Sequence, residues 1–165
     1  PRAMGNAWFA EKPLWAENAN AEISAINRFN PSAEAVIDVK FRDMVRKSNY
    51  PLSENDTIYL VLYKPDELVY KYSCRGEKLA VFSEIYYPAG WEVFIDGKNT
   101  DYFRTNYVLR GIILPEGDHE IKFVFRPASY ITGNKISLAS SLILFLLTAG
   151  YFVIPKLKRT KTGGK

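Results

Sequence analysis

The sequence predicts a mainly β protein: an antiparallel, jelly-roll-like β-sandwich with a short N-terminal helix, followed by one C-terminal transmembrane helix. Two observations support this prediction. Short apolar segments alternate with turn signals every eight to twelve residues between residues 35 and 125, which is typical of sandwiches. Residues 136–154 then form nineteen consecutive positions without a charge.

Four segments are therefore expected along the chain of 165 residues. They are an N-terminal arm with its helix (1–32), the sandwich (33–132), the transmembrane helix (136–154) and a basic tail (155–165). The sequence contains no internal repeat, no Gly-rich phosphate loop and no alternation of strands with helices, which argues against an α/β fold.

A short helix is expected over residues 20–29. Asn20 is a suitable N-cap, and Glu22 suits the positive end of the helix dipole. The apolar face of this helix consists of residues at helical spacing, namely Ile23, Ile26 and Phe29.

Seven strands are expected where β-branched and aromatic residues alternate with polar ones or form short apolar runs. They cover residues 35–41, 57–63, 68–73, 79–87, 91–95, 107–114 and 119–125. The dipeptide Asp96-Gly97 after the fifth strand is favoured in type I′ hairpin turns. Residues 74–77 are expected to form another turn.

The charge-free run 136–154 has the length of a membrane span. A helix of this length extends about 28 Å, close to the thickness of the hydrocarbon core of a bilayer. Eleven of its residues are Leu, Ile, Phe or Val, which together favour insertion by about 3 to 6 kcal/mol. Its Ser and Thr hydroxyls are expected to bond back to helix carbonyls. A buried core helix is the alternative, but such helices seldom carry apolar residues on every face.

The flanking charges predict the orientation of the span. Residues 155–165 contain five Lys or Arg and no acid, whereas residues 121–135 contain three. Because Lys and Arg beside a span mark its cytoplasmic side, the tail is expected in the cytoplasm and residues 1–132 outside it. Without the tail the chain has 17 Lys and Arg against 18 Asp and Glu, so the net charge of +4 suits anionic lipid rather than nucleic acid.

The single cysteine, Cys74, cannot form an intramolecular disulfide, so the sandwich is expected to be stabilised by an ordinary apolar core. Cys74 itself is expected to be an unreactive turn residue. The first residues do not resemble a signal peptide. Because a domain outside the cytoplasm must be exported, the chain is expected to be the C-terminal part of a longer membrane protein.

Three motifs follow one another before the span: FSEIYYPAGWEVFIDG (82–97), NYVLR (106–110) and LPEGDHEI (114–121). In this order they resemble the C-terminal region of the bacterial YfhO membrane-protein family. The opening PRA (1–3) is similar to a Pro-Arg-aromatic stretch that enters this region, with Ala3 in place of the aromatic residue.

The resemblance implies a large polytopic protein of the bacterial cytoplasmic (inner) membrane. It is similar to membrane glycosyltransferases that take sugars from polyprenyl phosphates on the outer face, some of which decorate cell-envelope polymers. It also implies that the catalytic acid lies in an earlier loop. No catalytic residue, metal ligand or cofactor is therefore assigned to this chain.

The titratable residues do not form a convincing catalytic set. His119 lies between Asp118 and Glu120, but neighbouring strand residues point to opposite faces and cannot converge on one metal. Asp96 and Asp101 are a plausible carboxylate pair, although turn chemistry fully accounts for Asp96.

Aromatic residues cluster around one predicted hairpin, and aromatic faces beside polar groups form the kind of surface on which sugars stack. The candidate glycan contacts are Tyr86, Tyr87, Trp91, Tyr102 and Arg104. The alternative is that the aromatic residues are core, as large rings usually are, and this is expected of Trp91 in particular. Arg104 and Arg110 are candidates for contact with a phosphate or lipid headgroup, or for pairing with neighbouring acids.

Three functional hypotheses follow, and all have the lipid bilayer as a partner. In the leading one, the sandwich is a non-catalytic accessory domain of the transferase. It packs on the N-terminal transmembrane core of the same protein and helps to position an acceptor glycan or a polyprenyl-phosphate sugar. The second is a carbohydrate-binding module on a membrane stalk, and the third is a tail-anchored protein with a cytosolic β-domain.

Overall fold

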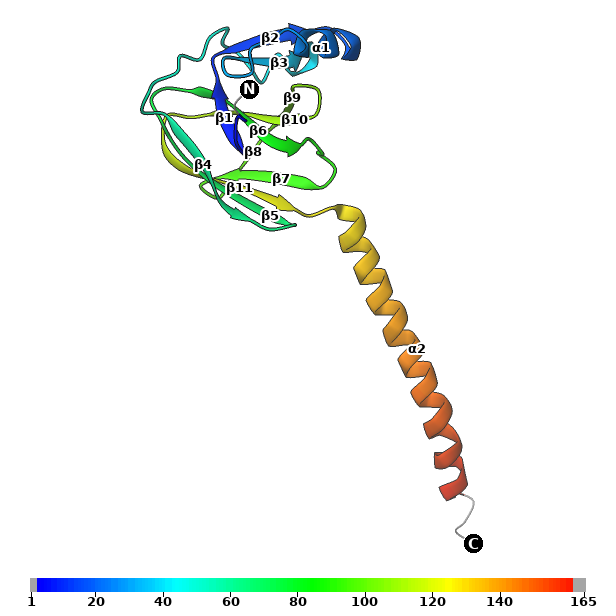
Figure 1. Cartoon of the computed structure of the whole chain (residues 1–165). Coiled ribbons are helices and arrows are strands. Elements are labelled where there is room, and N and C mark those ends of the chain that lie inside the picture. Colours follow the sequence, from blue (N-terminus) through cyan, green and yellow to red (C-terminus); the bar gives the residue numbers. More distant parts are fainter. Residues whose placement is uncertain (1–2, 162–165) are drawn as a thin grey trace. The chain divides into compact units, whose positions relative to one another are not determined.

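The computed structural model describes residues 3–161. The chain divides into two compact units, Pro1–Phe125 and Arg126–Lys165; the first is a two-sheet β structure and the second contains a long helix (Figure 1). The mainly β fold class predicted from the sequence is confirmed, together with a short N-terminal helix and an apolar C-terminal helix.

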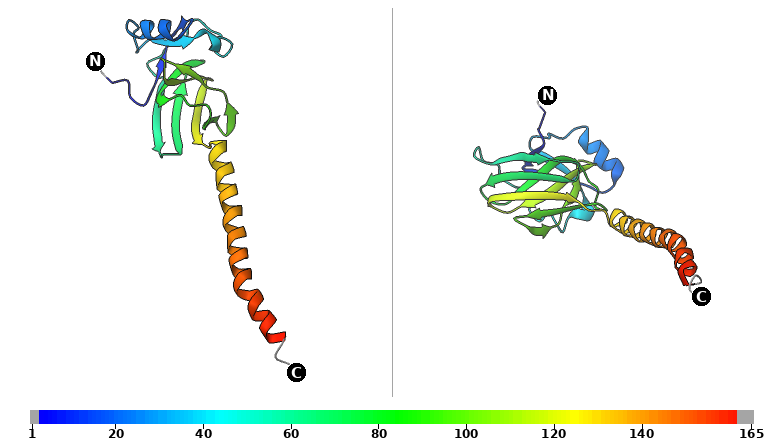
Figure 2. Two further views of the ribbon diagram at one scale, coloured as in Figure 1. Left: turned by 90° about the vertical axis from the view of Figure 1, so that its right-hand side faces the viewer. Right: turned by 90° about the horizontal axis from the view of Figure 1, so that it is seen from below.

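The first sheet has six strands in the order β1-β6-β10-β9-β3-β2. Their bounds are β1 (Ala7–Ala10), β6 (Lys78–Ile85), β10 (Leu109–Leu114), β9 (Phe103–Thr105), β3 (Glu34–Asp38) and β2 (Lys12–Ala16). Neighbouring strands are antiparallel except β2 and β3, which are parallel. The helix α1 (Ala19–Ile26) connects this parallel pair, and the three elements lie together at the top of Figure 1 and of the left view in Figure 2.

The second sheet has five antiparallel strands in the order β4-β5-β11-β7-β8. Their bounds are β4 (Thr57–Tyr63), β5 (Glu67–Cys74), β11 (Gly117–Phe125), β7 (Trp91–Ile95) and β8 (Lys98–Thr100). The edge strand β4 contains an irregularity between Leu60 and Leu62, where its register against β5 shifts.

The main core includes three buried rings that contact one another edge to face. The ring centroid of Tyr70 lies 4.9 Å from that of Phe82 and 6.1 Å from that of Phe123, and the centroids of Phe82 and Phe123 lie 5.2 Å apart. A second core includes Leu79 and Val81 of β6, which pack with residues of the 42–56 loop. Because β6 contributes to both cores, its sequence is a near-continuous apolar run rather than an alternating one.

Four short strands were missed by the sequence analysis. β1 and β2 lie in the predicted N-terminal arm, and β8 and β9 lie between the predicted fifth and sixth strands. Each contains three to five residues, and each is ordered by pairing with other strands; all four residues of β1, for example, pair with β6. Such segments carry too little periodicity to be recognised locally.

The N-terminal helix begins one residue before its predicted start, and its N-cap is Asn18 rather than Asn20. The Asn18 side chain accepts a hydrogen bond from the backbone N–H of Ala21 at 3.0 Å. The predicted apolar face is wrong at Ile23, which is 44% exposed, and Phe29 follows the end of the helix, whereas Ile26 is half-buried. Glu22, by contrast, is fully buried.

Three other boundaries differ from the prediction for local reasons. β3 ends at Asp38, whose side chain accepts the N–H of Lys40 at 3.0 Å and starts a 3₁₀ turn (Val39–Phe41). β10 begins two residues late because Tyr107 has a positive φ of 71°, which a strand does not accommodate. Cys74, predicted in a turn, is the last residue of β5 and is buried.

The second unit contains α2 (Ala128–Lys161), and its segment Thr132–Tyr151 is long and apolar enough to cross a membrane. None of this segment is buried. The predicted back-bonding is confirmed for two of the hydroxyls: Ser140 donates to the carbonyl of Ile136 at 2.9 Å, and Thr148 donates to that of Leu144 at 2.8 Å. Residues 162–165 of the predicted tail lie outside the described part of the chain.

Candidate functional site

Most of the predicted sugar-contact residues lie at one end of the sandwich, which we name the Phe125 end. It is the end at which β4, β6 and β11 finish and β5, β7 and β10 begin. Here Trp91 pairs with Phe125 in the sheet, and their rings lie 5.2 Å apart. Tyr87 also packs on Phe125, with ring centroids 6.4 Å apart, and remains 51% exposed.

A groove of about 370 Å³ lies at the edge of the second sheet beside Trp91. We name it the β7–β8 groove; its lining residues are Pro88, Trp91, Glu92, Val93, Asn99, Thr100, Asp101 and Tyr102. It combines two aromatic side chains with two carboxylates, an amide and a hydroxyl. Aromatic surface with convergent polar groups is the composition expected of a small-ligand site.

The hairpin turn between β7 and β8 sets the geometry of the groove. Asp96 and Gly97 have φ values of 49° and 78°, which agrees with the predicted type I′ turn. The resulting register places Val93 opposite Thr100 and Phe94 opposite Asn99. This register brings the polar residues of β8 beside the start of β7.

Tyr102 forms one wall of the groove and is held by both its ring and its hydroxyl. Its ring packs edge to face on Tyr86 at 5.2 Å and on Phe123 at 6.1 Å. Its hydroxyl donates to the carbonyl of Trp91 at 3.2 Å, and burial raises the pKa of Tyr102 to about 12. Tyr102 is therefore a neutral, rigid ring at neutral pH.

Arg110 lies against the ring of Trp91 and is 2% exposed. Its guanidinium carbon is 4.3 Å from the centre of the Trp91 ring and 4.9 Å from that of Phe123, and Nε donates to the carbonyl of Ile85 at 2.9 Å. Its Nη1 has no hydrogen-bond partner among the described residues. Burial lowers the pKa of Arg110. Burial also raises the pKa of Glu84, and the nearby positive charge of Arg110 partly offsets this rise. Arg110 is thus a buried cation that stacks on aromatic rings, not a surface group for a phosphate.

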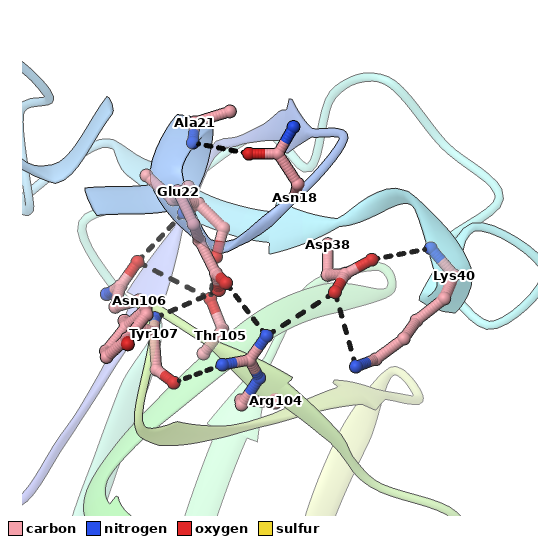
Figure 3. Close-up of polar contacts among 10 residues, drawn as sticks. Asn18, Ala21, Glu22, Asp38, Lys40, Arg104, Thr105, Asn106 and Tyr107 are labelled. Carbon is pink, nitrogen blue, oxygen red and sulfur yellow. Dashed lines mark hydrogen bonds and ion pairs between the residues drawn. The ribbon is translucent and has the colours of Figure 1, made fainter. Parts of the chain in front are cut away.

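Arg104, the fifth predicted sugar contact, is not among the residues that line the groove. Its Nη2 donates to Glu22 at 2.8 Å and to Asp38 at 3.4 Å, and its Nη1 donates to the carbonyl of Tyr107 at 2.7 Å (Figure 3). The predicted alternative of pairing with acids is therefore what the structure has. Neither acid is a sequence neighbour of Arg104.

The loop after Arg104 is fastened to the same network. Glu22 accepts the backbone N–H of Tyr107 at 3.1 Å (Figure 3). The Asn106 side chain accepts the N–H of Val36 at 2.8 Å, and the Asn106 backbone N–H donates to the Val36 carbonyl at 2.7 Å. Asn106 and Tyr107 both have positive φ, of 45° and 71°. These contacts hold the loop at Asn106 and Tyr107 in its left-handed conformation, so their role is structural.

At the other end of the sandwich, both ring nitrogens of His119 have oxygen partners within the fold. Its Nδ1 lies 2.5 Å from Asp96 Oδ2, and its Nε2 lies 3.0 Å from the carbonyl of Glu116. The hydrogen bond to Asp96 is the main cause of a raised His119 pKa, and the Asp96 pKa is lowered, first by the N–H of Glu120 and then by His119. Because both of its nitrogens are engaged by oxygen atoms of the fold, His119 has a structural role rather than that of a general base.

The other residues that the sequence suggested for chemistry, Cys74, Asp96 and Asp101, do not form a reactive site together. Burial raises the pKa of the Cys74 thiol. Asp96 is bonded to His119, whereas Asp101 lines the groove, so the two form no contact pair. Among residues 3–161, no group of three His, Cys, Asp or Glu side chains is placed to hold a metal ion.

Of the residues that line the groove, Trp91, Tyr102 and Asp101 are candidates from the sequence, whereas Glu92, Asn99 and Thr100 are not. The type I′ turn was the available signal, because it fixes which residues of β8 face β7.

Comparison with protein families gives one match. A family model described as bacterial membrane protein YfhO matches residues 53–137, just over half of the chain, and includes both the β7–β8 groove and the start of the apolar helix. Comparisons with curated proteins and with solved structures give no match.

Proposed function

Because the chain belongs to the YfhO family of bacterial membrane proteins, we propose that it is the C-terminal accessory domain and last span of a polytopic glycosyl-transfer protein. The sandwich lies outside the cytoplasm and binds a glycan in the β7–β8 groove. The parent protein transfers sugar from a polyprenyl-phosphate carrier to cell-envelope polymers, and the chemistry takes place in its N-terminal transmembrane core. This chain contributes no catalytic group.

The composition of the groove is the observation that supports this proposal. Trp91 and Tyr102 line the groove with aromatic surface for the apolar C–H face of a pyranose, while Glu92, Asn99 and Asp101 offer acceptors and a donor for its hydroxyls. Glu92, Asn99 and Asp101 are exposed, so their polar atoms are free to exchange water for sugar hydroxyls. A volume of about 370 Å³ suits one or two sugar rings.

Glycan binding by the full chain in lipid nanodiscs tests this proposal. Asp101→Ala and Asn99→Ala remove exposed polar groups from the groove without touching the core, and each is expected to weaken binding about tenfold, or about 1.4 kcal/mol. Glu17→Ala, an exposed acid outside the groove, is the matched control and leaves binding unchanged. Absence of binding to any envelope glycan, or equal losses in all three variants, contradicts the proposal.

The same groove suits a carbohydrate-binding module on a membrane stalk, the second candidate function. The accessory domain and the stand-alone module differ in whether the parent protein needs the groove for sugar transfer. Asp101→Ala in the whole parent protein is expected to reduce sugar incorporation into the envelope polymer if the domain is an accessory of the transferase. Unchanged incorporation with impaired glycan binding favours the stand-alone module.

The basic tail supports the placement of the sandwich outside the cytoplasm. Asp118 is exposed and lies in the first unit, so Asp118→Cys provides a labelling position. In intact cells that make the parent protein, a membrane-impermeant maleimide is expected to label it without permeabilisation. Labelling only after permeabilisation places the sandwich in the cytoplasm and contradicts this topology.

A further inference from the structure

Exposed apolar side chains are concentrated at the Phe125 end of the sandwich. Four large residues at this end are exposed: Tyr63 (63%), Ile85 (70%), Tyr87 (51%) and Val108 (46%). They come from the end of β4, the end of β6, the β6–β7 connection and the loop before β10. None of them lines the β7–β8 groove.

Hydrogen bonds and ring contacts hold these four segments together. The Val108 carbonyl accepts the N–H of Tyr86, at 2.7 Å, in the segment that links Ile85 to Tyr87. The Tyr87 ring packs on Phe125, whose N–H donates to the Asp66 carbonyl at 2.8 Å in the turn that follows Tyr63. The four side chains therefore belong to one fixed rim rather than to independent loops.

The rest of the sandwich surface differs from this rim. At the opposite end, the β7–β8 turn carries Asp96, the β10–β11 connection carries Glu116, and Asp118 is the second residue of β11. Of the other exposed large apolar residues described before Arg126, Tyr59 and Val61 lie along β4 on the approach to Tyr63. The remaining two, Ile23 and Leu52, come from α1 and from the 42–56 loop.

The chain itself ties the Phe125 end to the apolar segment. β11 ends at Phe125, and the apolar segment Thr132–Tyr151 begins seven residues later. Seven residues reach at most about 25 Å when fully extended, which is less than the thickness of a bilayer. The apolar end of the sandwich is thus the end from which the chain continues into the apolar segment.

We propose that Tyr63, Ile85, Tyr87 and Val108 form a lipid-contacting rim that enters the headgroup region of the bilayer. Tyrosine is favoured at the membrane–water interface because its ring is apolar and its hydroxyl is polar, and two of the four residues are tyrosines. The opposite end, with Asp96 and Asp118, faces water. This inference goes beyond glycan binding and stands without it.

Contact with lipid would also position the groove. The β7–β8 groove begins at Trp91, which is paired with Phe125, so it lies at the same end as the rim. A rim seated in the headgroups holds the groove at the height at which a sugar is linked to a lipid carrier.

Nitroxide labels on the full chain in vesicles of phosphatidylcholine and phosphatidylglycerol test this proposal. Cys74 is 6% exposed, so an added surface cysteine is labelled selectively. Ile85→Cys and Tyr87→Cys report on the rim, and Asp118→Cys is the matched position at the opposite end. The thermal unfolding midpoint of each labelled variant verifies that the sandwich is folded.

At positions 85 and 87, relaxation by oxygen, which concentrates in lipid, is expected to exceed relaxation by a water-soluble nickel chelate. At position 118 the order is reversed. Equal nickel accessibility at all three positions means that the rim is in water and overturns the proposal. Protection of positions 85 and 87 from both reagents means that protein covers the rim, which also overturns it.

Discussion

Glu22 in α1 and Arg104 in β9 are separated by 82 positions in the sequence and form an ion pair between Oε2 and Nη2 at 2.8 Å. The Glu22 side chain is fully buried, whereas that of Arg104 is 21% exposed and also pairs with Asp38. The two oxygens of Glu22 are both used, since the other accepts the N–H of Tyr107. One carboxylate thus joins α1, β9 and the loop that follows β9.

Replacement of Glu22 by Ala is expected to destabilise the sandwich by about 3 kcal/mol, because it leaves Arg104 without its closer acidic partner and the Tyr107 N–H without an acceptor. For a domain of this size the unfolding midpoint falls by about 10 °C. Glu22→Gln retains an acceptor and costs less. Intrinsic fluorescence is a suitable measurement, since all three tryptophans lie in the first unit, at positions 8, 15 and 91.

Glu17→Ala is the control for this series, because Glu17 is exposed. An unfolding midpoint for Glu22→Ala that matches that of Glu17→Ala would show that the buried ion pair contributes nothing.

Asn106 allows its hydrogen bonds to be separated from its backbone strain. Its side chain accepts the N–H of Val36 at 2.8 Å, and its φ is 45°. Both Asn106→Gly and Asn106→Ala lose the side-chain contacts with Val36 and Thr105, a loss expected to cost about 1 to 3 kcal/mol. The alanine variant keeps a Cβ in the left-handed region, as Asn106 does, whereas glycine relieves that strain, so the Gly variant is expected to be the more stable of the two by about 1 kcal/mol.

Chemical denaturation of the two Asn106 variants measures this difference. Equal stability of the Gly and Ala variants would mean that the loop relaxes out of its left-handed conformation when the side-chain bond is lost.

The features that the sequence predicted well are those with a local cause. The apolar run of β6, the Asp96-Gly97 hairpin and the charge-free helix each have a signal within about twenty residues. The burial of Glu22 has no local signal, because its partner Arg104 is brought to it by the sheet. An amphipathic pattern therefore predicted Ile23 as the buried residue instead.

The candidate groove was half predictable for the same reason. Trp91 and Tyr102 stand out because large aromatic residues are informative in any sequence context. Asn99 and Thr100 are ordinary polar residues in sequence, and only the register of β8 against β7 brings them beside the start of β7.

The contact between His119 and Asp96 makes stability depend on pH in two directions. The folded pKa of His119 is raised above its ordinary value of 6.5, so its contribution is complete below that value and is lost as pH rises through the folded pKa. The folded pKa of Asp96 is lowered below 3.8, so its contribution is present above that value and is lost as pH falls through the folded pKa. Because the Asp96 side chain is 49% exposed, the pair contributes less than about 1 kcal/mol.

His119→Gln is expected to lower the unfolding midpoint by a few degrees at about pH 5 and by less at about pH 9. Unfolding curves at the two pH values measure this. A loss that is equal at both values would mean that packing against Tyr72, 5.4 Å away, matters rather than charge.

The Cys74 thiol is expected to resist modification in the folded chain. It is 6% exposed, its Sγ donates to the carbonyl of Pro115 at 3.4 Å, and burial raises its pKa, so the reactive thiolate is scarce. Reaction with a maleimide at neutral pH is expected to be at least about a hundredfold slower in the folded chain than in denaturant. Rapid labelling of the folded chain would show that the end of β5 opens readily.

Arg110 is expected to be replaced more easily by an apolar side chain than by lysine. A lysine ammonium at this position stays buried but cannot stack as a plane between the rings of Trp91 and Phe123, so Arg110→Lys is expected to cost about 2 to 4 kcal/mol. Arg110→Met removes the buried charge and keeps apolar contact with both rings, although it leaves the Ile85 carbonyl without its donor, and is expected to cost about 1 to 2 kcal/mol. Denaturant unfolding of both variants gives their order, and the fluorescence of Trp91 reports on the loss of the cation from its ring. If Arg110→Lys is the more stable variant, the positive charge beside Glu84, and not the stacking, is what this buried site requires.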